Sequence, residues 1–223
     1  MKQSNEGFTV YDCKRDIRNI LVTPQIRARF CYMEPGTGSH EGFGHTHDLG
    51  HEIFIVLSGR LEFKINGEAH ELGPGQMCYA LVDESHTVRA LGDEPVYFYL
   101  SVTPHIQPTH TMYNDKGERE PAHFRPSSDY NTETDNSLAV PAHIDRYLDA
   151  MQETATVTKN CATMQRELAN ALKKAVGEDD EKAATQIREQ MWEPLLSTFK
   201  HMTDLAGEWN ALCPRVGHIN KHY

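Results

Sequence analysis

The sequence lacks any long uncharged apolar run, and its first residues contain no apolar stretch of the signal-peptide type. Only 39% of its 223 residues are hydrophobic, and no segment approaches the roughly 18 apolar residues of a membrane span. Basic residues are also few, with 22 Lys and Arg against 32 Asp and Glu, so the net charge is −10. Such a chain lacks the positive field that attracts nucleic acid or anionic lipid. We therefore expect a cytoplasmic protein that binds a small molecule and has no nucleic-acid or membrane partner.

Cysteine is sparse, and its pattern excludes two common uses of this residue. The five cysteines are odd in number and widely spaced, and no C-x-x-C motif occurs. This argues against a disulfide framework and against a zinc knuckle. Histidine, by contrast, is abundant at 13 residues. Four of these histidines fall within twelve positions: His40, His45, His47 and His51.

Residues 8 to about 103 have the composition of short β-strands separated by turn residues. The Asn66-Gly67 pair is a strong hairpin signal, because both central residues of a type I′ turn need a positive φ. Short strands at this spacing favour an antiparallel sandwich or barrel. The expected strands cover Ile17–Val22, Ile26–Met33, Glu52–Leu57, Arg60–Ile65, Met77–Val82, Thr87–Leu91 and Val96–Val102.

The rest of the chain changes character twice. Residues 104–141 contain prolines and a polar, acidic stretch, which predict an extended arm followed by a mobile linker. Residues 142–223 carry apolar side chains at three- and four-residue steps, which predict two helices in a hairpin. Gly177 and the acids after it separate the two helices, and Pro194 should kink or restart the second one.

The residues with the clearest chemical potential lie at the centre of the barrel region. His45 and His47 are two positions apart, so on a strand they point to the same face. Glu52, at the start of the next strand, can fold back to the same point, and His86 is the natural fourth partner. Three imidazoles and a carboxylate suit a first-row transition metal ion. Four protein ligands leave a coordination position open for a substrate or dioxygen.

These residues resemble the first sequence motif of the cupin superfamily. That motif has His-x-His, three or four residues, Glu, six residues and then Gly, and His45, His47, Glu52 and Gly59 match it. The glycine that the motif places six residues before its first histidine is replaced by Ser39. The spacing to Gly59 favours Glu52 over its neighbour His51 as the ligand. Adjacent strand residues face opposite sides, so His51 then points outward or supports the site from behind.

A second cupin-like motif follows at the expected distance. Gly75 and His86 keep the family's eleven-residue spacing, whereas the intervening proline and glycine slots hold Leu81 and Asp83, and the trailing asparagine slot holds Ala90. The ligand positions are therefore intact, and the turn before His86 departs from the family pattern.

The resemblance implies a fold and a cofactor. The fold is mainly β, a double-stranded β-helix (jelly-roll) cupin barrel over residues 1–112. Composition and apolar periodicity, not the resemblance, predict an extended arm over residues 113–141 and an α-helical extension over residues 142–223. One divalent transition metal ion per subunit (Fe, Mn, Ni, Co, Cu or Zn) would be bound by His45, His47, Glu52 and His86.

The walls of the pocket are less readable from the sequence. Arg27 and Arg29 either point inward, to clamp a carboxylate or enolate, or lie on the solvent face of a half-buried strand. Tyr97 and Tyr99 are likewise candidates for substrate binding or for structural packing. His51 is a further candidate for substrate contact. Three residues lie just past the barrel, where an arm could close over its mouth: His105, His110 and Tyr113.

The resemblance implies a metal-dependent enzyme, and several reaction classes remain open. The first is a dioxygenase, an oxidoreductase that acts on an enolisable or phenolic substrate, with Glu52 doubling as a base. The alternatives are a lyase or isomerase on the same centre and a non-catalytic cupin that binds a metal or small molecule. By analogy with small cupins we also expect a homodimer.

Overall fold

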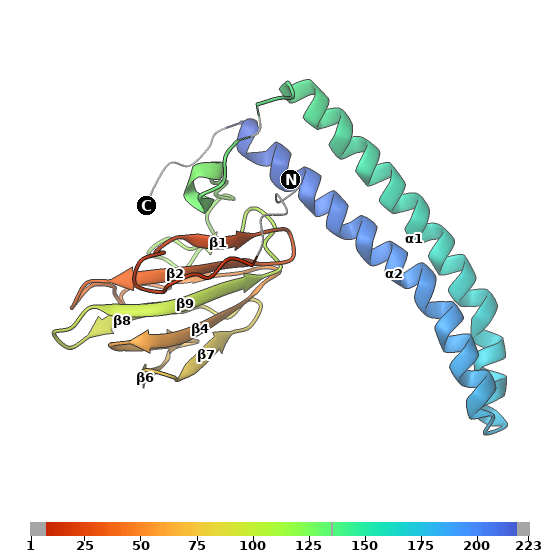
Figure 1. The fold of residues 1–223 in the computed structure, drawn as a ribbon, viewed down its shortest axis with the longest axis horizontal. Helices are drawn as coiled ribbons and strands as arrows, with labels where there is room; N and C mark the ends of the chain where they lie inside the picture. Colours follow the sequence, from red (N-terminus) through yellow and green to blue (C-terminus); the bar gives the residue numbers. More distant parts are fainter. Residues whose placement is uncertain (1–7, 135, 218–223) are drawn as a thin grey trace. The chain divides into compact units, whose positions relative to one another are not determined.

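The computed structural model describes residues 8–134 and 136–217, which form two compact units. The first unit extends to Thr134 and the second ends at Val216. Within the described residues, the first unit holds ten β-strands and the short 3-10 helix η1 (Ser127–Tyr130), whereas the second holds two long α-helices (Figure 1). The expected fold class, a mainly β barrel followed by a helical region, is confirmed. The boundary expected at residue 112 lies inside the first unit.

The strands of the first unit form two antiparallel sheets. One has the order β1-β2-β9-β4-β7 and the other the order β10-β3-β8-β5-β6. The strands are β1 (Asn19–Val22), β2 (Arg27–Met33), β3 (His45–Thr46), β4 (His51–Ser58), β5 (Arg60–Ile65), β6 (Glu68–Leu72), β7 (Met77–Ala80), β8 (His86–Leu91), β9 (Val96–Thr103) and β10 (Thr111–Met112).

The hydrophobic core lies between the two sheets. Phe54 and Phe98 of the first sheet belong to one buried cluster with Leu61 and Phe63 of the second. Along each strand these residues alternate with side chains of the outer face, as the two-residue period of a strand requires. The chain passes from β4 of one sheet to β5 of the other through Gly59 alone. The two sheets therefore enclose a common interior, and one end of that interior holds the site described below.

Three strands escaped the sequence-based prediction. Four of the five residues of β6 are exposed, so this strand has no apolar alternation to reveal it. β3 and β10 have two residues each, too few for any pattern. The hairpin expected at Asn66-Gly67 is present between β5 and β6, with φ values of 49° and 87°.

The arm expected to be a mobile linker is instead partly folded onto the first unit. Tyr130, the last residue of η1, is 4% exposed. Asn131 follows it, and its side-chain oxygen accepts a hydrogen bond of 2.9 Å from the backbone N–H of Asn19 in β1. The buried ring and the hydrogen bonds to Asn19 together hold the segment on the first unit and offset part of the cost of ordering it.

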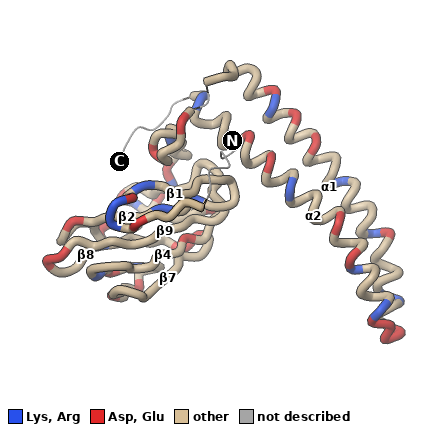
Figure 2. The backbone as a smooth tube through the Cα atoms, in the orientation of Figure 1, with Lys and Arg blue, Asp and Glu red and all other residues tan. Residues whose placement is uncertain are grey.

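The second unit is a helical hairpin of α1 (Val140–Gly177) and α2 (Glu181–Leu212). Thr154 of α1 donates a hydrogen bond of 3.1 Å to the carbonyl oxygen of His201 in α2. Acidic residues gather where the two helices meet, at the N-terminus of α2 (Figure 2). α2 continues through Pro194, so the restart, one of the two outcomes expected there, is wrong. None of the described helices is apolar enough over its length to cross a membrane.

Candidate metal centre

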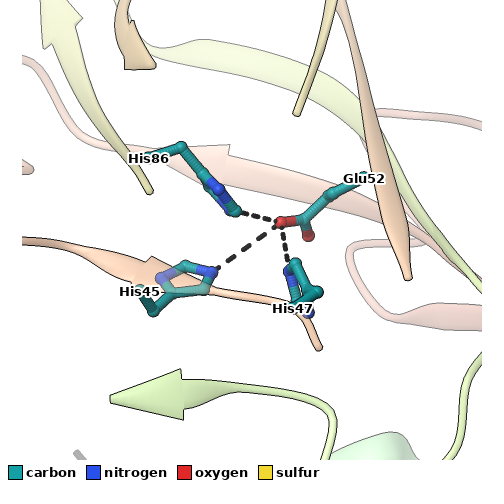
Figure 3. Close-up of side chains that lie close together, drawn as sticks. All are labelled: His45, His47, Glu52 and His86. Atoms are coloured by element: carbon teal, nitrogen blue, oxygen red, sulfur yellow. Dashed lines mark hydrogen bonds and ion pairs between the residues drawn. The ribbon is translucent and has the colours of Figure 1, made fainter. Parts of the chain in front are cut away.

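Four side chains from separate parts of the first unit converge on one point. His45 opens β3, His47 follows that strand, and His86 opens β8, whereas Glu52 belongs to β4 of the other sheet. β3 and β8 pair with His45 directly opposite His86. The Nε2 atoms of His86, His47 and His45 lie 2.7, 2.8 and 3.7 Å from Oε2 of Glu52 (Figure 3). One ligand atom from each of the four residues lies within 4.8 Å of the others.

The cluster is largely shielded from solvent. His47, Glu52 and His86 are between 1% and 3% exposed, and His45 is half-buried. Burial by itself would raise the pKa of Glu52, but its contacts with the three imidazoles outweigh burial and hold that pKa well below its usual range. Burial would likewise lower the pKa of His86, but the hydrogen bond and charge of Glu52 raise it. For His45 burial dominates, and its pKa is lowered.

Two backbone carbonyls determine which ring nitrogen faces the centre. Nδ1 of His47 donates to the carbonyl oxygen of Thr109 at 2.6 Å, and Nδ1 of His86 donates to that of Glu84 at 2.9 Å. A carbonyl oxygen only accepts, so the proton of each neutral ring is on Nδ1 and Nε2 presents a lone pair. Such outer contacts are those that orient histidines in metal sites.

The chemistry of the cluster fits a bound cation. With neutral rings, the Nε2 lone pairs of His47 and His86 face a carboxylate oxygen of Glu52 at hydrogen-bond distance, which is repulsive unless a cation or an extra proton lies between them. The Nε2 atom of His45 is buried and has no hydrogen-bond partner. Three imidazole nitrogens and one carboxylate oxygen form a donor set that first-row transition metals accept. The residues present therefore fit the ion that the sequence motif implies.

A pocket of about 500 Å³ opens from this cluster. Arg27 and Arg29 of β2 line it, and so do Glu52 and His86. The aromatic part of the wall is formed by Phe54, Phe63 and Phe98. Because Phe54 lies two residues after Glu52 on β4, it shares the face of Glu52, a relation the sequence pattern could have revealed.

Residues just past the barrel complete the wall. The ring of His110 lies 4.7 Å from that of His45 and 4.9 Å from that of His47, and both His110 and Tyr113 line the pocket. Burial lowers the pKa of His110 well below its usual value, which leaves its ring neutral. His105 is buried away from the lining, against Tyr130 at 4.7 Å, and burial lowers its pKa to about 3.

Three candidate substrate-binding residues lie away from the pocket. On β9, Phe98 points inward, so its neighbours point outward: the ring of Tyr97 packs against Tyr32 at 5.2 Å, and that of Tyr99 packs against Phe30 at 6.2 Å. His51 is exposed, and its Nδ1 accepts a hydrogen bond of 3.1 Å from the backbone N–H of Val82. Of the two alternatives for Tyr97 and Tyr99, the structure shows structural packing, and His51 points outward; substrate binding is corrected for all three, because strand alternation turns them to the outer face.

Arg27 and Arg29 are on the inner face, so the alternative of a solvent-facing strand side is excluded for them. Arg27 is only 5% exposed, and its Nη2 lies 3.8 Å from Oε1 of Glu52. Its guanidinium also lies over the ring of Tyr130 at 5.7 Å. The roles of Thr109, Glu84 and Tyr130 were missed from the sequence. Thr109 and Glu84 act through their backbone carbonyls, and a carbonyl gives no signal in the sequence. Tyr130 is distant from Arg27 in the sequence and contacts it only in the folded chain.

A family model and several solved structures are similar to parts of the chain. Residues 29–103 match the family model of the cupin domain. No curated protein matches the chain. Among solved structures, a conserved protein with a double-stranded β-helix domain from Klebsiella pneumoniae is 20% identical, with 52% of this chain and 99% of that chain covered and a TM-score of 0.40.

Two further solved structures are similar to the chain. A cupin protein from Bacteroides fragilis is 21% identical, with 46% of this chain and 86% of that chain covered and a TM-score of 0.38. A sugar phosphate isomerase of the cupin superfamily from Silicibacter pomeroyi is 25% identical, with 40% of this chain and 55% of that chain covered and a TM-score of 0.34. Residues 29–103 of this chain are therefore a cupin domain, and a C-terminal helical region lies outside the matched part.

Proposed function

We propose that this protein is a metal-dependent cupin enzyme, an oxidoreductase of the dioxygenase type that acts on an enolisable or phenolic small molecule. The observation that carries the proposal is the convergence of His45, His47, Glu52 and His86 beside a pocket of about 500 Å³. This volume lies in the range of pockets that enclose small organic ligands. A buried site with a preset donor geometry is what metal-assisted catalysis requires.

The chain's own residues supply positioning and proton transfer. His47 and His86 are held by backbone carbonyls, so their Nε2 atoms are preset to bind a divalent metal. Oε2 of Glu52 faces the imidazoles, whereas Oε1 lies on the side of Arg27. Oε1 is therefore the atom that can accept a hydrogen bond from an enolisable or phenolic hydroxyl entering the pocket, and the low pKa of Glu52 limits proton transfer to hydroxyls that are acidified at the centre. When bound, the ion would supply a Lewis acid and a redox partner for dioxygen.

The pocket wall suits an aromatic or enolic substrate. The ring centroid of Phe54 lies 5.8 Å from that of His86 and 4.6 Å from that of Phe63. A planar substrate can therefore pack against apolar rings while its oxygen atoms reach the cluster. The neutral ring of His110 adds a polar group without adding charge.

The first test measures metal binding by the full chain. We expect one equivalent of Fe(II), Ni(II) or Zn(II) per chain, measured by titration calorimetry and elemental analysis. His47→Ala removes a buried ligand, so the metal affinity of the variant should fall at least about a hundredfold. This is more than the loss expected when only a hydrogen-bond partner of a ligand is removed. His51→Ala is the matched control, because His51 is an exposed histidine next to Glu52. Equal losses in the two variants would contradict the proposed centre.

The second test separates the reaction classes. Oxygen uptake is measured with the Fe(II)- and Ni(II)-loaded protein on a panel of enolisable and phenolic compounds. Stoichiometric uptake, abolished by Glu52→Gln, would support a dioxygenase. Turnover without oxygen uptake would assign the centre to a lyase or isomerase. Metal binding with no turnover of any kind would favour a binding protein.

A further inference from the structure

The buried and half-buried part of the pocket wall holds two arginines and a single carboxylate. Arg27 and Arg29 are two positions apart on β2, so both side chains point to the inner face. Among the described residues, Glu52 is the only carboxylate within ion-pair distance of either guanidinium, and it reaches only Arg27. Glu52 is already engaged by three imidazoles. The other acids of the wall, Glu41 and Asp115, are exposed.

Both arginines have donors that no protein acceptor satisfies. The Nε atoms of Arg27 and Arg29 are buried and have no hydrogen-bond partner. The group that Arg29 does meet is the thiol of Cys31, and burial raises the pKa of that thiol to about 11, so it carries no charge at neutral pH. A buried charged donor without a partner is costly. This arrangement is stable when an anion from outside the chain supplies the acceptors.

The side chain of Arg27 is also held in place before any ligand binds. The guanidinium of Arg27 lies over the buried ring of Tyr130, at 5.7 Å from its centroid. The residues opposite Arg27 on the two neighbouring strands are Val22 and Val102. Opposite Arg29 lie Leu100 and Asn19, and the side-chain oxygen of Asn19 accepts no hydrogen bond, so it does not engage Arg29. Preset arginines lose little conformational entropy when they bind a planar anion.

We propose that the pocket binds a small organic carboxylate, whose carboxylate group is held by the guanidinium groups of Arg27 and Arg29. Its apolar body lies against the wall of Phe54, Phe63 and Phe98. A carboxylate is favoured because its two oxygens match the planar fork of a guanidinium. The proposal names the substrate class of the site and rests on the proposed function only for what the metal centre does to the bound molecule.

The test uses the full chain and a matched pair of probes. Phenylacetate and its neutral analogue phenylacetamide are titrated into zinc-loaded and chelator-treated protein by calorimetry. We expect phenylacetamide to bind at least about tenfold more weakly, the factor expected for loss of charge-assisted hydrogen bonds. Benzoate and hexanoate extend the panel to bodies of other shapes.

Arg29→Gln is the decisive variant, because Arg29 does not contact Glu52. It should bind phenylacetate at least about tenfold more weakly, while its affinities for phenylacetamide and for zinc stay unchanged. Arg29→Lys keeps the charge but loses the planar guanidinium, so its affinity for phenylacetate should lie between those of the wild type and of Arg29→Gln. Arg89→Gln is the control, since Arg89 is an exposed arginine on β8 that pairs with Glu62.

Several results would overturn the proposal. These are equal affinities for the acid and the amide, wild-type affinity in Arg29→Gln, no binding of any carboxylate in the panel, or inorganic phosphate competing as well as phenylacetate. Failure of the proposed function would give a different result. The wild-type protein would then bind no zinc, or would show no turnover, while its carboxylate binding still depended on Arg29.

Discussion

At the scale of the residue, the backbone at Gly44 decides how closely His45 can approach His86. Gly44 has a φ of 68°, and a Cβ at this position would lie 2.3 Å from the carbonyl oxygen of His86. Glycine is thus required at this position for two reasons: the positive φ, and the lack of space for a side chain. Gly42 has a similar φ of 77°, but a Cβ there meets nothing within 4 Å.

We expect Gly44→Ala to separate β3 from β8 and so to disturb the metal centre. Metal affinity should fall about tenfold to a hundredfold, as when a supporting contact of a ligand is lost. The free energy of unfolding should fall by about 3 kcal/mol or more, because dihedral strain and a backbone clash add. Titration calorimetry and urea unfolding measure the two effects.

Gly42→Ala serves as the control for dihedral strain alone. It should cost about 1–2 kcal/mol of stability and leave metal affinity unchanged. If both variants bound metal equally well, close approach at Gly44 would not be what positions His45.

At the scale of the element, the start of α2 depends on one side chain. The carboxylate of Asp180 accepts a hydrogen bond of 3.0 Å from the backbone N–H of Ala183, which satisfies one of the free donors of the first turn. The chain reverses just before it, at Asp179, which has a φ of 53°. The acidic run read from the sequence as a helix start therefore acts through a specific cap as well as through its charge.

We expect Asp180→Ala to destabilise the helical unit by about 1 kcal/mol, and Asp180→Ser to retain most of that stability, because a hydroxyl also caps. Both tryptophans of the chain, Trp192 and Trp209, lie in α2. Their fluorescence during urea unfolding therefore reports on this unit. A serine variant as unstable as the alanine variant would show that the cap is not the cause.

At the scale of the whole molecule, the candidate site belongs entirely to the first unit. Every residue that lines the pocket falls between Arg27 and Asp115, and the unit extends to Thr134. The residues after 112 contribute Tyr113 to the wall and Tyr130 beneath Arg27. None of the described residues of the helical unit is among these groups. The expected homodimer stays a prediction, which light scattering on the full chain would test.

A chain shortened after Thr134 should therefore keep the β-type circular dichroism spectrum and the metal affinity of the full chain. A chain shortened after Met112 should lose carboxylate binding, because the packing beneath Arg27 is removed. Calorimetry on the two shortened chains checks both statements. Loss of metal binding in the longer chain would mean that the helical unit supports the centre.

Local sequence spacing was sufficient to predict much of this protein. The grouping of His45, His47 and Glu52 follows from the spacing of the first motif, and the hairpin at Asn66-Gly67 follows from dihedral preference alone. The two helices follow from apolar periodicity interrupted at Gly177. These features depend on residues close in sequence, whose geometry is set by the backbone.

The tertiary structure decided what depends on distant partners. It turned Phe98 inward and Tyr97 and Tyr99 outward, a choice of face that alternation permits but does not make. It also brought the carbonyl oxygen of Thr109 to His47 and the ring of Tyr130 to Arg27. A backbone carbonyl is the same in every residue, and a long-range contact leaves no local pattern, so only the folded chain reveals which nitrogen faces the centre and which charges face the pocket.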